Sequence, residues 1–131
     1  MPKRLRATHL FVQDYDAAIA FFTQALAFVL IENTVLDAAT GKRWVRVAPD
    51  KKSGGQLLLV RADSASAAAM LGQQAGDKVF MFLDTADIHA DYAHMLASGV
   101  QFVSPPALKP HGWVAVFLDI SGNRWDLVQP S

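Results

Sequence analysis

Few residue types in this chain could carry out chemistry, and they are widely spaced. The absence of cysteine excludes a disulfide, a thiolate metal site and a cysteine nucleophile. Two of the four histidines, His89 and His94, fall off the apolar stripe of a predicted helix, so we interpret them as surface residues. His9, His111 and Asp126 remain, and an imidazole with a carboxylate can hydrogen-bond a ligand, transfer a proton or hold a metal ion.

The elements that position these residues follow one order, which occurs twice: a strand, a helix and three strands. Alternation and turn signals predict strands at residues 5–12, 28–36, 43–48, 56–61, 79–83, 100–103, 113–118 and 124–128. The first helix covers residues 15–26, with Asp14 as its N-cap. Two acidic residues, Asp84 and Asp87, are alternative caps for the second helix, whose apolar face we expect to contain Ile88, Tyr92, Met95 and Leu96.

Three stretches of sequence resemble a known family. They are HLFVQDYDAAIAFFTQALAF at 9–28, LASGVQFV at 96–103 and FLDISGNRWDL at 117–127, of which the last is the most specific. They are similar to motifs of the vicinal oxygen chelate superfamily, which includes glyoxalase I, bleomycin-resistance proteins and extradiol dioxygenases. The resemblance covers nearly the whole chain and implies an α+β fold, in which two βαβββ modules form a half-open, eight-stranded, barrel-like cleft.

The predicted boundaries make the chain a single domain, residues 1–131. The first module covers about 4–62, a helical linker 63–76, and the second module about 77–130. The chain departs from the family pattern at two places. It has Ala27 where relatives often have glycine, and Ile120 where they often have proline. We expect Asp119 and Asn123 still to support the last turn through side-chain hydrogen bonds to the backbone.

Metal-dependent relatives place one ligand on each of four strands, and the resemblance transfers these positions to Ala7, Phe80 and Asp126 and, less exactly because of the loop before it, to a position near Leu58. Three of these side chains cannot bind a metal ion, so we predict no family-type metal site and no cofactor. A weak divalent-metal site from His9, Asp126 and His111 remains an alternative, because a strand presents residues 7 and 9 on the same face.

Strand alternation and the resemblance together predict a largely aromatic cleft. The predicted ligand-binding residues are His9, Phe11, Trp44, Arg46, Phe80, Phe82, His111 and Asp126. The rings could instead only fill the space between modules, and His111 could be an exposed loop residue. Asp126 is either a general base or the partner of Arg46 or Arg124 in an ion pair. Whether Trp44 and Arg46 face the cleft stays open, because Val45 and Val47 compete for the inside.

Charge and hydropathy restrict the partners. Twelve basic and twelve acidic side chains cancel, which argues against a nucleic-acid partner. No apolar run is long enough to cross a membrane, and no signal peptide is evident at the N-terminus, so we expect a cytoplasmic location. The resemblance adds a homodimer as the expected assembly.

Three functions compete. The first is a metal-free protein, similar to the bleomycin-resistance type, that binds an aromatic or amphipathic small molecule in the cleft. The second is a lyase, isomerase or dioxygenase of the superfamily that uses His9 and Asp126, with or without a divalent metal. The third is an accessory domain without a small ligand, which the lack of an appended DNA-binding segment weakens. The sequence therefore leaves open whether the chain is an enzyme.

Overall fold

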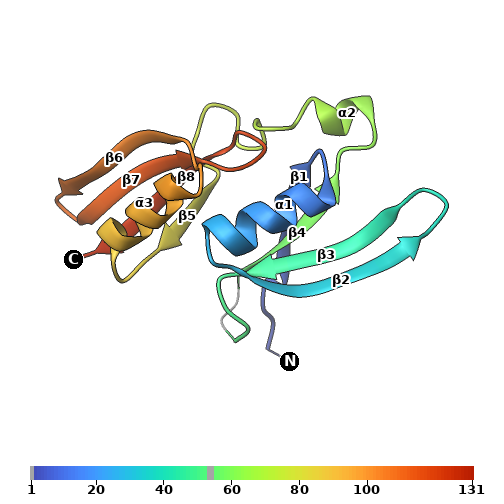
Figure 1. Ribbon diagram of the computed structural model, residues 1–131, viewed down its shortest axis with the longest axis horizontal. Coiled ribbons are helices and arrows are strands. Elements are labelled where there is room, and N and C mark those ends of the chain that lie inside the picture. Colours follow the sequence, from blue (N-terminus) through green and yellow to red (C-terminus); the bar gives the residue numbers. More distant parts are fainter. Residues whose placement is uncertain (1, 53–54) are drawn as a thin grey trace. The chain divides into compact units, whose positions relative to one another are not determined.

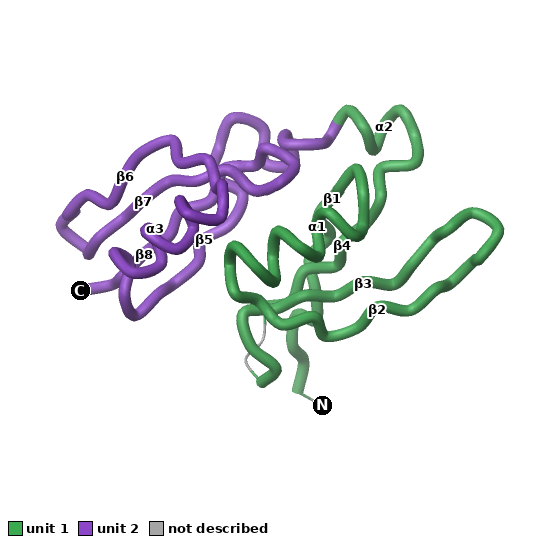
Figure 2. The backbone as a smooth tube through the Cα atoms, in the orientation of Figure 1, with its two compact units in different colours: residues 1–69 green, residues 70–131 purple. Residues whose placement is uncertain are grey.

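The computed structural model describes residues 2–52 and 55–131, and their contacts divide the chain into two compact units, Met1–Ala69 and Met70–Ser131 (Figure 2). Each unit has the predicted order of strand, helix and three strands, and each forms one four-stranded mixed sheet. The boundary between the units falls inside the stretch that the sequence predicts as a linker. The α+β class and the repeated βαβββ order are therefore confirmed.

Unit 1 is a sheet with the strand order β1-β4-β3-β2, in which β1 pairs parallel with β4 and the other neighbours are antiparallel. Figure 1 shows α1 lying over β1 and β4, and the long β2–β3 hairpin. Its elements are β1 (Ala7–Val12), α1 (Tyr15–Ala20), the π-helix η1 (Phe21–Ala25), β2 (Val29–Asp37), β3 (Lys42–Ala48), β4 (Gln56–Arg61) and the short helix α2 (Ala65–Ala68).

Unit 2 repeats this topology with the order β5-β8-β7-β6, and β5 pairs parallel with β8. Its elements are β5 (Met81–Asp84), α3 (Ile88–Ala97), β6 (Phe102–Lys109), β7 (Gly112–Leu118) and β8 (Arg124–Pro130). Asp87, rather than Asp84, caps α3, because its carboxylate accepts a hydrogen bond from the amide of Ala90 at 3.1 Å.

The two helices cover one face of each sheet and form the cores there. Residues at alternate strand positions, which point toward the helix, are almost completely buried. In unit 1 these are Leu10, Val12, Val45, Val47, Leu57 and Leu59 against Ala18 and Phe22, and in unit 2 Ala115, Phe117, Trp125 and Leu127 against Ile88 and Met95. Leu10 and Val12 thus lie under the first helix, and Trp125 and Leu127 under the second, as strand alternation requires when His9 and Asp126 point to the opposite face.

Three local predictions were wrong in detail. The first helix is α-helical only to Ala20, and the residues that follow form a π-helical turn. The side chain of Leu96, expected on the buried face of the second helix, is 46% exposed. The strand predicted at 100–103 runs instead from Phe102 to Lys109, with a register shift between Ser104 and Ala107. It is an edge strand, which tolerates the two intervening prolines.

Buried polar groups fix the turn between β7 and β8. One oxygen of the Asp119 carboxylate accepts hydrogen bonds from the amides of Ser121 and Asn123, at 2.9 and 3.0 Å, and the other accepts from the indole of Trp125 at 2.9 Å. The amide oxygen of Asn123 accepts in turn from the backbone of Gln74, at 3.2 Å. The predicted support of this turn by Asp119 is therefore confirmed, and it extends to the segment that precedes β5.

Among the described residues, no helix is both long and apolar enough to span a membrane.

Candidate functional site

The predicted site residues of unit 1 lie on the side of the sheet opposite α1, which we call the helix-free face of unit 1. His9 is exposed, while its neighbour Leu10 is completely buried beneath α1. Phe11 points the same way as His9, and the two rings contact each other edge to face with centroids 6.4 Å apart. Val45 and Val47 are also completely buried. Trp44 and Arg46 must therefore lie on the helix-free face.

The Arg46 guanidinium is held by two neighbours on this face. Its Nε and Nη2 atoms donate to Glu32 Oε1 at 3.2 and 2.8 Å, and Nη1 donates to Gln56 Oε1 at 2.5 Å. The hydrogen bond from Arg46 holds the pKa of the Glu32 carboxyl below its usual range. Most of the directed donors of Arg46 are therefore used within the sheet. Few of its donors remain to bind an anionic ligand, although its aliphatic stem still contributes to the surface.

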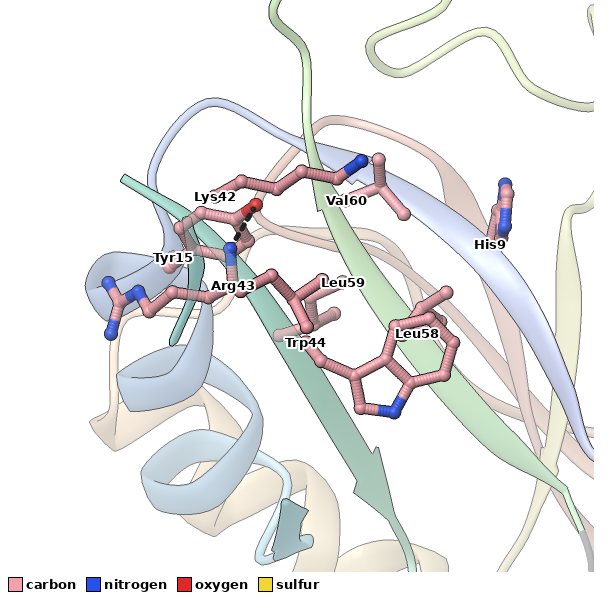
Figure 3. A pocket seen from close by; sticks show the side chains of 9 residues that line it. His9, Tyr15, Lys42, Arg43, Trp44, Leu58, Leu59 and Val60 are labelled. Atoms are coloured by element: carbon pink, nitrogen blue, oxygen red, sulfur yellow. Dashed lines mark hydrogen bonds between the residues drawn. The ribbon is translucent and has the colours of Figure 1, made fainter. Parts of the chain in front are cut away.

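A pocket of about 190 Å³ opens at the edge of this face (Figure 3). The β3–β4 ladder runs from Val47 and Leu57 to Val45 and Leu59, and beyond this last pair the two strands separate. The Tyr15 hydroxyl bridges toward the separated end of β3, where it accepts a hydrogen bond from the amide of Arg43 at 3.2 Å. The apolar lining residues are Leu36, Trp44, Leu58, Leu59 and Val60, and the polar ones are His9, Tyr15, Lys42 and Arg43.

Asp126 occupies the helix-free face of the unit 2 sheet, between Phe82 of β5 and Val116 of β7 in the strand register. Burial raises the pKa of the Asp126 carboxyl, and the positive charge of nearby His111 opposes this shift. Within the described part of the chain, no hydrogen bond or ion pair to this carboxylate is formed. A half-buried carboxylate among apolar neighbours is suited to accept a proton.

The remaining predicted residues of unit 2 differ in their surroundings. Phe82 is 67% exposed and lies beside Asp126 on the helix-free face. Phe80 precedes β5, and its ring lies 6.2 Å from that of Trp125, a core residue. His111 is exposed in the β6–β7 turn, yet close enough to act on Asp126 electrostatically. The structure thus groups His9, Phe11, Trp44 and Arg46 in one unit, and Phe82, Asp126 and His111 in the other.

The residues at the family's metal positions do not fit a metal ion. The two units are equivalent in register, because His9 pairs with Leu58 as Phe82 pairs with Asp126. This equivalence supports Leu58 as the counterpart of Asp126, a placement that the sequence left approximate. Methyl, isobutyl and benzyl side chains at Ala7, Leu58 and Phe80 supply no donor atom. Among residues 2–52 and 55–131, no three histidine or acidic side chains gather in a way that could hold a metal ion.

Sequence reasoning missed several residues of these surfaces. Glu32 and Gln56, which hold Arg46, gave no signal beyond polar positions in strands. Tyr15 and Lys42 line a pocket only because β3 and β4 separate there. No local sequence pattern predicts where two strands stop pairing. The sequence shows only that Tyr15 directly follows the helix cap. The structure buries this side chain, and a buried hydroxyl needs a hydrogen-bond partner.

Comparisons with known proteins agree with this architecture. An uncharacterized protein of Shewanella frigidimarina is 48% identical over 120 residues, covering 92% of this chain and 88% of that protein. The crystal structure of UcmS2 matches with a TM-score of 0.82 and 27% identity, covering 98% of both chains. TnmS3, described as an antibiotic binding protein from Streptomyces sp. CB03234, matches with a TM-score of 0.77 and 27% identity, covering 99% of this chain and 98% of its own.

The sequence model of one protein family spans residues 4–127, nearly the whole chain. That range includes most of both βαβββ units and all the candidate site residues named above. This chain therefore belongs to the Glyoxalase/Bleomycin resistance protein/Dioxygenase superfamily.

Proposed function

We propose that the chain is a metal-free binding protein for an aromatic or amphipathic small molecule. The observation that carries the proposal is the chemistry of the helix-free faces. Rings and aliphatic groups stand at three of the four positions where metal-dependent relatives have ligands. The polar groups are few: His9, Asp126, and Arg46 with its partners Glu32 and Gln56. Such a surface binds through apolar contact and uses single polar groups to orient the ligand. The likeness to TnmS3, described as an antibiotic binding protein, supports the same class of ligand.

Phe82 offers a direct test, because its ring is 67% exposed on the helix-free face of unit 2. A panel of aromatic and antibiotic compounds is screened by tryptophan fluorescence and thermal shift. For a compound that binds at this face of unit 2, we expect Phe82→Ala to weaken binding about fivefold, the loss of roughly 1 kcal/mol of apolar contact.

Leu108 provides the matched control, since it is equally exposed but pairs with Trp113 in the strand register, on the other face of the sheet. Leu108→Ala should leave the affinity unchanged. A panel without a single binder would contradict the proposal, and so would a ligand whose affinity falls equally in both variants. The proposal also includes a homodimer, as the family resemblance implies, and a cytoplasmic location, as the sequence predicts; analytical ultracentrifugation measures the assembly.

One observation favours a second function, an enzyme of the same superfamily. The unpaired carboxylate of Asp126, with its pKa raised by burial, is suited to act as a general base for a lyase or isomerase. In that case Asp126→Asn would abolish turnover of a compound while leaving its binding largely intact. A pure binding protein would release every bound compound unchanged, which mass spectrometry of the recovered ligand distinguishes.

A further inference from the structure

The pocket at the separated end of β3 and β4 lies entirely within unit 1, and its walls are chemically uneven. One side is apolar, formed by Trp44, Leu58 and Val60. The polar groups on the other side include Lys42, and Figure 3 shows its side chain extending across the opening toward Val60. None of the described residues that line the pocket is acidic.

Among the described residues, Lys42 brings a positive charge to this pocket that no ion pair compensates. Arg43, which also lines it, forms an ion pair with Asp16 at 3.0 Å. In the ranges that the structure describes, no carboxylate lies within ion-pair distance of the Lys42 ammonium. An ammonium group above an apolar wall attracts an anion, because a nearby low-dielectric surface weakens the screening by water.

The volume of the pocket and its aromatic wall restrict the kind of molecule that can carry the anionic group. A volume of about 190 Å³ exceeds the roughly 150 Å³ of an apolar cavity that accepts benzene, so one ring with a short substituent fits. Trp44 supplies an aromatic surface against which such a ring can stack. The indole N–H of Trp44 has no hydrogen-bond partner among the described residues and can report a bound ligand.

We propose that this pocket selects a small aromatic carboxylate, with the ring against Trp44 and Leu58 and the carboxylate at the Lys42 ammonium. This inference rests on the proposed function and specifies its ligand class: an aromatic ring bearing an anion. Selection comes from charge, since a neutral ring of the same shape has the same apolar contacts but lacks the ion pair.

Benzoate and benzamide form a matched pair of probes that differ in charge and little in shape. The chain has three tryptophans, and the indole ¹H–¹⁵N signal of Trp44 is assigned by its disappearance in Trp44→Phe. In titrations of the full chain, we expect benzoate to shift this signal with a Kd at least about threefold below that of benzamide, as for a partly exposed ion pair. Higher ionic strength should reduce this ratio.

Substitutions test the contribution of the Lys42 charge and that of the apolar wall separately. Lys42→Met keeps the aliphatic stem and should bring the two affinities together, whereas Trp44→Leu should weaken both. Lys78→Met, which removes an exposed lysine of unit 2, should retain the preference for benzoate. The proposal is overturned if benzamide binds as tightly as benzoate, if Lys42→Met keeps the preference, or if neither probe shifts the Trp44 signal. Other aromatic compounds that bind in the wider panel would then still uphold the proposed function.

Discussion

Asp126 combines burial with the absence of a hydrogen-bonding partner in the described structure, so its ionisation has a cost for the folded state. Its pKa is raised by burial above the ordinary value of 3.8, and the charge of His111 opposes this only in part. The folded chain therefore holds this proton to a higher pH than the unfolded chain does. It follows that the free energy of unfolding falls as the pH rises from about the ordinary value through the raised pKa.

We expect Asp126→Asn to remove this dependence. The variant should be more stable than the wild type at pH 7, by less than about 1 kcal/mol because solvent screens a partly exposed charge. The difference should shrink as the pH falls through the raised pKa toward 3.8 and disappear below it, where both chains are neutral at this position. Urea unfolding at a series of pH values measures it. Asp77→Asn, at an exposed site paired only with Lys78, is the control. A variant less stable than the wild type at pH 7 would show that the carboxylate is stabilised after all.

At the level of the elements, the exit from the first helix contains an unusual backbone conformation. Ala27 has a φ of +57°, the only positive φ outside glycine among the described residues. It follows η1, where the amide of Phe28 donates to the carbonyl of Phe22 at 2.8 Å. This helix end is similar to a Schellman motif, but its closing hydrogen bond encloses one more residue because the last turn is π-helical. The left-handed residue at such an end is usually glycine. Alanine in that conformation costs about 1–2 kcal/mol.

Ala27→Gly should therefore stabilise the chain. Relief of the left-handed strain is offset in part by the greater freedom of glycine in the unfolded chain, which leaves a gain of roughly 0.5–1 kcal/mol. Ala20→Gly, within the helical conformation at the end of α1, is the matched control and should destabilise by up to about 1 kcal/mol. Thermal and urea unfolding of both variants measure the two effects. If both substitutions lowered the stability equally, the proposed strain at Ala27 would be refuted.

Local patterns predicted the elements well and their irregularities poorly. Alternation in β1 and β8 identified the buried faces, because one face of each strand packs under a helix. The π-helical turn escaped notice, since the apolar spacing of Phe22 and Ala25 suits an α-helix equally well. The continuation of β6 through Pro105 was missed because proline normally argues against a strand, and only the edge position makes it acceptable.

The candidate site was predictable only where it depends on strand alternation. His9 and Phe11 follow directly from the burial of Leu10 and Val12. The clamp on Arg46 and the pocket beside Lys42 depend on which residues face each other across neighbouring strands, and that register is a property of the assembled sheet. Strand alternation therefore predicted the face on which each side chain lies, but not the residues that it contacts on neighbouring strands.

At the scale of the whole molecule, the chain contains few side chains that could bind a metal ion. The chain has no cysteine and four histidines, and the counterparts of the family ligands include three side chains without a donor atom. Asp126 is the one acidic group at such a position. A functional divalent site usually needs three or more protein ligands in a fixed geometry, so we predict that tight metal binding does not contribute to stability.

A metal-binding assay tests this prediction with a stated sensitivity. A ligand present at 100 times its Kd raises the free energy of unfolding by about 2.7 kcal/mol, which is a shift of several degrees in Tm for a domain of this size. At about 100 μM Ni²⁺, Zn²⁺, Mn²⁺ or Fe²⁺, an unchanged Tm therefore argues against a Kd below about 1 μM. Elemental analysis of the purified chain should likewise find less than one metal ion per chain. A stoichiometric metal that is lost in His9→Ala or Asp126→Asn would overturn the prediction and favour the enzyme.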